Sequence, residues 1–170
     1  MRNRKRLLIA AFLSLPLAVV GVAVAAGAFD GAKSATAPFH DLDKAMAAGY
    51  TVKVADLSGA TCIAQPGEGG MGVHMLNPSL LDGSVDADHP ELLVYDPKAK
   101  GGDLKLAALE YLVIQSAWAA PGRPKLFGRE FDFTGTPNRY GLPPFYSLHA
   151  WIWKPNPSGI LYAWNPRVEC

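Results

Sequence analysis

Apolar residues recur along this chain with two kinds of spacing, one that predicts a helix and one that predicts strands. Phe39, Leu42 and Met46 are spaced at helical intervals, so they share one face of a predicted helix over residues 36–48. Thr36 at its start is a residue type that caps helix N-termini. The first folded element is therefore expected to be an amphipathic helix.

From residue 50 onward, short apolar runs separated by turn residues predict strands. The run over residues 104–114 is the longest and is apolar on both faces, as in a central strand or one that lines a barrel. One helix followed by strands predicts an α+β fold, with the N-terminal helix packed on a mainly antiparallel sheet or a small open barrel. The predicted strands cover residues 50–54, 72–76, 92–95, 104–114 and 148–153.

The first 26 residues have the pattern of a secretory signal peptide. Four of the first six residues are cationic, an apolar run follows from Leu7, and it ends in small residues near Ala26. Residues 27–35 are then expected to be a linker, and residues 36–170 a single secreted or periplasmic domain. The alternative is an uncleaved anchor that holds the domain outside the cytoplasm, because a run of about 20 apolar residues can just span a bilayer.

Charge excludes one class of partner. The formal net charge is +1, and the N-terminal segment holds four of the positive charges, so the remainder is mildly acidic. Without a basic stripe to neutralise phosphates, nucleic acid is not an expected partner. Contact with a membrane is expected only through the N-terminal segment if that segment stays uncleaved.

The chain has two cysteines, Cys62 and Cys170. In an oxidising compartment such a pair usually closes into a disulfide, which the export pattern makes relevant here. The bond would enclose a loop of about 108 residues and tie the last residue to the body of the domain.

A glycine-rich stretch, Gly67-Glu68-Gly69-Gly70-Met71-Gly72, matches the letters of a dinucleotide-binding motif. That motif needs a strand before it and a helix after it, and here a strand-like segment follows. Residues 65–72 are therefore predicted to form a tight loop beside the sheet. The chain contains no G-x-S-x-G and no H-E-x-x-H motif.

Three of the four histidines lie among apolar residues, where polar groups are unusual. His40 falls in the first turns of the predicted helix and His74 on a strand. His149 alternates with Trp151 and Trp153 on one strand face, and Glu110 lies in the longest strand. His89 precedes a proline in an Asp-rich connection and is expected to be a solvated loop residue.

A carboxylate inside such a strand needs a partner, and two kinds of partner are open. His40, His74, Glu110 and His149 would together form a site for Zn, Mn, Fe or Ni, because imidazole and carboxylate are suitable ligands for these metals. Alternatively, Glu110 pairs with Arg129, Arg139 or Lys105 in a structural network, or the tryptophans line a pocket for a small ligand.

Several segments resemble a group of uncharacterised secreted bacterial proteins. The resemblance is carried by residues 35–41 (ATAPFHD), 70–74 (GMGVH), 92–95 (LLVY), 109–111 (LEY), 148–153 (LHAWIW) and 164–166 (WNP). It implies that the motifs holding His40, His74, Glu110 and His149 occur together. The group has no established activity, so the resemblance implies no catalytic residue.

Three functions therefore remain open for an exported domain. It binds a metal ion or a small polar ligand through His40, His74, Glu110 and His149. Alternatively, it is a metal-assisted enzyme in which Glu110 acts as general base. In the third alternative it is a structural or interaction protein of the cell envelope, with histidines that are satisfied core residues.

Overall fold

The N-terminal region of the domain is helical, but it begins earlier than expected. The computed structural model describes residues 27–98 and 103–170, so the predicted signal over 1–26 lies outside the described residues. Helix α1 spans Asp30–Thr36, the 3-10 helix η1 spans Ala37–His40, and α2 spans Leu42–Ala47. The expected linker over 27–35 and single helix over 36–48 are therefore wrong in their boundaries.

Local chemistry explains this division into short helices. The Thr36 hydroxyl donates to the Ala32 carbonyl 2.6 Å away, so Thr36 ends α1 instead of capping a later helix. Asp41 is the residue that caps, because its carboxylate accepts from the backbone N–H groups of Asp43 and Lys44 at the start of α2.

The rest of the chain is built on an antiparallel sheet, which confirms the predicted α+β class. The strands follow the order β1-β3-β4-β5-β9-β8, β2 also pairs with β3, and β6 and β7 form a separate ribbon. The strands are β1 (Val52–Lys53), β2 (Cys62–Gln65), β3 (Gly69–Leu76), β4 (Leu92–Asp96), β5 (Lys105–Ile114), β6 (Lys125–Leu126), β7 (Arg129–Glu130), β8 (Asp132–Thr134) and β9 (Phe145–Ala150). Two more 3-10 helices, η2 (Pro78–Leu80) and η3 (Gln115–Ala117), lie in the connections.

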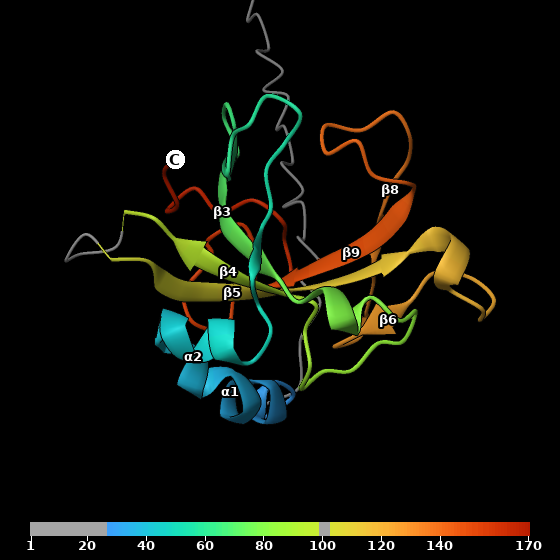
Figure 1. The fold of residues 1–170 in the computed structure, drawn as a ribbon, viewed down its shortest axis with the longest axis horizontal. Helices are drawn as coiled ribbons and strands as arrows, with labels where there is room; N and C mark the ends of the chain where they lie inside the picture. The colour runs from blue at the N-terminus through green and yellow to red at the C-terminus, as the bar shows by residue number, and fades with distance from the viewer. Residues whose placement is uncertain (1–26, 99–102) are drawn as a thin grey trace, which may run out of the picture.

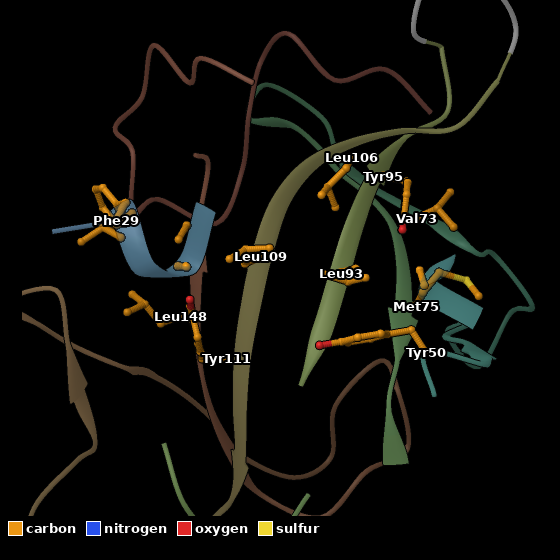
Figure 2. Close-up of a cluster of buried hydrophobic side chains, with 14 of the residues drawn as sticks. Phe29, Tyr50, Val73, Met75, Leu93, Tyr95, Leu106, Leu109, Tyr111 and Leu148 are labelled. Atoms are coloured by element: carbon orange, nitrogen blue, oxygen red, sulfur yellow. The ribbon is translucent and has the colours of Figure 1, made fainter. Parts of the chain in front are cut away.

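The helices cover one face of this sheet and form the main core with it (Figure 1). Alternate residues of β3, β4, β5 and β9 face the helices, and Figure 2 shows their side chains gathered there. The largest fully buried ones include Tyr95, Tyr111, Leu93, Leu109 and Leu148. The intervening residues of the same strands point to the opposite face.

Strand β9 ends at Ala150, three residues before the predicted end. The backbone turns because the N–H groups of Trp151 and Trp153 donate to Ile160 and Ala107 instead of continuing the ladder. Trp153 therefore packs against the main core and donates its indole N–H to the Thr36 hydroxyl at 3.3 Å. The expectation that Trp153 shares a face with His149 is wrong.

The glycine-rich stretch belongs to β3 from Gly69 onward, so the predicted loop over 65–72 is too long. The C-terminal segment lies directly on it: Gly70 exchanges two backbone hydrogen bonds with Asn165, at 3.1 and 3.0 Å. A Cβ atom at Gly70 would lie 2.8 Å from the Val168 side chain. These glycines admit a close backbone approach rather than a phosphate.

The predicted disulfide between Cys62 and Cys170 is confirmed. It fastens the chain end to β2, beside the place where Val168 packs against Val94 and Trp151. Within the part of the chain that the structure describes, the search for a helix long and apolar enough to cross a bilayer finds none.

Candidate metal site

Three strands place His74, Glu110 and His149 on the sheet face that lies opposite the helices. In β3 the neighbours of His74 are core residues, and the same alternation holds for Glu110 in β5 and His149 in β9. Glu110 and His149 are paired residues of adjacent strands, whereas β4 separates β3 from β5.

The sheet has to curve for His74 to reach the other two side chains. His74 and His149 are three strands apart, which is about 14 Å in a flat sheet with its usual strand spacing. Their Nε2 atoms nevertheless lie 3.2 Å apart. The ladder between β4 and β5 has a register shift at Val94/Tyr95, and such irregularities add local twist. The two imidazoles therefore meet across the two intervening strands, β4 and β5.

The three side chains form a compact cluster. His74 Nε2 lies 3.3 Å from Glu110 Oε2, and His149 Nδ1 lies 3.7 Å from Glu110 Oε1. One ligand atom from each residue falls within 4.8 Å of the others. Two ligands bound at about 2.05 Å with tetrahedral angles are separated by about 3.3 Å. The two distances from His74 Nε2, to His149 Nε2 and to Glu110 Oε2, have this value, whereas the 3.7 Å contact involves the other ring nitrogen of His149.

Burial sets the protonation of the cluster. His74, Glu110 and His149 are 3%, 5% and 2% exposed. Burial lowers the pKa of His74 to about 4 and holds that of His149 well below its usual range. It raises the pKa of Glu110 to about 7, although the Ser147 hydroxyl acts in the opposite direction. Both imidazoles are therefore neutral at pH 7, and their contacts with Glu110 are not ion pairs.

Neutral imidazoles and one acid are the protonation states that a metal site needs. The two Nε2 atoms face each other, and without a metal one must donate and the other accept. With a metal, both lone pairs and the carboxylate would point at a common ion. The donor set suits Zn, Mn, Fe and Ni alike, since all accept imidazole and carboxylate.

A pocket of about 610 Å³ opens on one side of the cluster. His74 and Glu110 form part of its wall, and His149 does not. Most of the wall is apolar and includes Leu76, Leu92, Leu112, Ile114 and Phe145. Its size lies within the usual range for small-molecule sites, about 300–1,000 Å³.

The cations expected to neutralise Glu110 are engaged elsewhere. Arg139 lies 2.9 Å from the Asp56 carboxylate, and Arg129 donates to both Asp132 carboxylate oxygens at 3.1 Å. Lys105 begins β5, five residues before Glu110, and its charge lowers the pKa of His40 after the larger effect of burial. The predicted structural network around Glu110 is therefore wrong in its partners.

His40 does not join the cluster, so the prediction of a fourth ligand there is wrong. It lies exposed in η1, where its ring meets Trp153 edge-on at 4.5 Å, on the helix side of the sheet. His74, Glu110 and His149 open onto the other face, and the sheet separates the two positions. His89 is exposed and contacts Asp86 at 2.9 Å, as expected of a solvated loop residue.

Two residues beside the cluster were not predicted. Ser147 is two residues before His149 on the same strand face, so strand alternation could have identified it. Tyr140 lies in the loop before β9, and no periodic signal marks it. Burial, and then the charge of Glu110, raises the pKa of Tyr140 to about 12, so its hydroxyl stays protonated.

Comparison with protein-family models, curated proteins and solved structures gives no match for this chain. Its function therefore has to be inferred from the geometry and chemistry of the site.

Proposed function

We propose that this domain binds one divalent transition-metal ion through His74, Glu110 and His149. One observation carries the proposal: three ligand atoms from three strands lie within 4.8 Å of one another in a buried cluster. Among the described residues, no other group of three His, Cys, Asp or Glu side chains reaches this spacing. Three protein ligands with an open fourth position are typical of sites that bind or activate a further molecule.

Metal content with matched histidine variants tests this function. Protein purified without a tag and reconstituted with Zn²⁺ or Co²⁺ is expected to hold one equivalent after desalting. His74→Ala and His149→Ala should each lower the affinity at least tenfold, since each removes one of three ligands. His40→Ala and His89→Ala remove an exposed imidazole and serve as controls that should bind like the wild type.

A blank metal analysis for the wild type would contradict the proposal. Equal losses in the His40→Ala and His74→Ala variants would also contradict it, because they would show surface binding instead. In either case the cluster would be a structural polar network between satisfied core residues.

A metal-assisted enzyme is a second candidate, and the pocket of about 610 Å³ beside His74 and Glu110 favours it. A purely structural metal is normally closed off by a fourth protein ligand, and His40 does not supply one. In this candidate the metal activates a molecule that reaches it from the pocket. Turnover of ester or amide probes that depends on added metal, and is lost in His74→Ala, would support it.

We also propose that the domain works outside the cytoplasm, secreted or in the periplasm. The signal-like pattern over residues 1–26 and the confirmed disulfide support this location, because such bonds persist in oxidising compartments. Cell fractionation with N-terminal sequencing tests it. A mature chain beginning near residue 27 in the periplasm or medium is expected, and a full-length cytoplasmic chain with reduced cysteines would contradict it.

A further inference from the structure

The charge of the proposed site determines what its open position would accept. A divalent ion contributes two positive charges, the Glu110 carboxylate removes one, and an imidazole binds a metal as a neutral ligand. One positive charge therefore remains in a buried environment, where an uncompensated charge is costly. A fourth ligand with a single negative charge would neutralise it.

The cationic side chains in the rest of the pocket wall are already paired with carboxylates. Arg129 and Arg139, which form part of its wall, are each paired with a carboxylate, Asp132 and Asp56. The apolar part of the wall includes Leu76, Leu92, Leu112, Ile114 and Phe145, which belong to one hydrophobic cluster. Polar side chains such as Thr134, Asn138 and Ser147 are a minority of the wall, so most of a bound molecule would contact apolar side chains.

The pocket wall also offers a hydroxyl group that can donate a hydrogen bond to a bound molecule. Tyr140 is part of the wall, and its hydroxyl has no hydrogen-bond partner among the described residues. His74 and Glu110 form part of the same wall as Tyr140, so all three border one cavity. A protonated phenol can donate to an anionic group bound at that position.

Resting on the proposed metal site, we propose that the pocket binds a monocarboxylate with an apolar body. The carboxylate completes the coordination of the metal at His74, Glu110 and His149, and the tail lies along the leucine-rich wall. The ligand class is thus an amphiphile with one negative charge, such as a medium-chain fatty acid or an aromatic acid.

Binding of three simple probes to the Co²⁺-loaded protein tests this ligand class. Octanoate carries both the head and the tail, acetate carries the head alone, and octan-1-ol carries the tail without the charge. Octanoate is expected to change the visible Co²⁺ spectrum and to bind at least tenfold more tightly than either of the others. The metal-free protein should bind octanoate at least tenfold more weakly than the Co²⁺ form.

A matched pair of variants locates the tail. Ile114→Trp fills the pocket wall, whereas Ile160→Trp makes the same change at a position 38% exposed and outside the wall. Ile114→Trp should weaken octanoate at least tenfold and keep one equivalent of Co²⁺, and Ile160→Trp should match the wild type. If Ile114→Trp does not fold, Leu142→Trp at a wall position that is 37% exposed provides the same test.

The outcomes separate this inference from the metal site itself. One equivalent of Co²⁺ with octanoate no tighter than acetate, or no tighter than octan-1-ol, would overturn the ligand class and leave the metal function standing. Octanoate binding that is unaffected by the wall variants would also overturn it. Failure to bind Co²⁺ would overturn both proposals.

Discussion

Glu110 supplies the negative charge of the three-residue cluster, so its protonation would control the affinity of the proposed metal site. The pKa of Glu110 is raised to about 7 by burial, and that of His74 is lowered to about 4. Below pH 7 a metal must therefore displace a proton from Glu110, whereas the histidines are already neutral. The apparent affinity is expected to rise about tenfold per pH unit up to about pH 7 and to level off above it.

Titration with Co²⁺ between pH 5.5 and 8.5 measures this dependence. Glu110→Gln is the control, since it keeps the shape of the side chain and removes its proton. In this variant the affinity should be lower and nearly independent of pH above 5.5. A wild-type curve that is flat across this range would show that Glu110 is not a ligand.

A second buried acid, Glu91, makes a separate prediction about stability. It is 2% exposed and accepts a hydrogen bond from the Leu112 N–H at 2.9 Å. Burial raises its pKa to about 8, although that hydrogen bond acts in the opposite direction. The native state therefore binds more protons than the unfolded chain between the ordinary glutamate pKa and about 8, and stability falls as pH rises through this window.

Glu91→Gln should remove this loss, because the amide oxygen can still accept from Leu112. At pH 8 the metal-free variant is expected to be more stable than the wild type by on the order of 2 kcal/mol, with a smaller difference at pH 5. Urea unfolding at the two pH values measures it. Parallel pH dependence in both proteins would contradict the account.

At this scale the sequence identified three members of the cluster and misplaced the fourth. His74, Glu110 and His149 each interrupt an apolar strand, and strand alternation gives each a face. The apolar neighbours of His40 make it a candidate as well, but a single position in a short helix gives no such constraint on the direction of its side chain. Tyr140 was missed because loop residues have no periodicity.

At the scale of elements, the packing of the C-terminal segment on β3 requires a glycine at position 70. A Cβ atom at Gly70 would lie 2.8 Å from both the Val168 side chain and its carbonyl oxygen. Gly70→Ala should therefore destabilise the fold by about 1–3 kcal/mol, as overpacking does in a dense interior. Urea unfolding measures the change.

Gly135→Ala is the matched control, because its added Cβ would lie 3.6 Å from Phe133, an ordinary contact. It should change the free energy of unfolding by less than about 0.5 kcal/mol. Equal free energies of unfolding for the two alanine variants would contradict this prediction, because they would show that the C-terminal segment can shift away from the added Cβ without losing stability.

Strand positions were more predictable than strand ends and helix starts. The apolar run of β5 identified the central strand within one residue of its observed start, Lys105. The end of β9 depends on distant acceptors, Ile160 for Trp151 and Ala107 for Trp153, which no local pattern contains. The glycines of β3 have the composition of a loop. They are needed because the segment around Asn165, about 95 residues later in the chain, packs closely against them, and no local sequence pattern indicates that contact.

For the whole molecule, the disulfide closes the domain by joining β2 to the last residue. Cys62 and Cys170 are 108 residues apart, and a cross-link over such a loop removes about 4–5 kcal/mol of chain entropy from the unfolded state. The Cys62→Ser, Cys170→Ser double variant should lose stability on that order in urea unfolding.

The wild type treated with a reductant is the matched control and should lose a similar amount. Identical unfolding curves for oxidised wild type, reduced wild type and double variant would contradict a stabilising role.

The disulfide pairing could be predicted from the sequence because the chain has two cysteines and an export pattern. The curvature that brings His74 to His149 could not, because it arises from the whole sheet.

The most direct test of the metal site is anomalous X-ray scattering from crystals of the Zn²⁺-loaded protein. Data collected on both sides of the zinc absorption edge should show one peak between His74, Glu110 and His149, about 2.0–2.2 Å from one atom of each. A zinc peak at any other position, with these three side chains still in mutual contact, would show that they form a structural polar network and not a metal site.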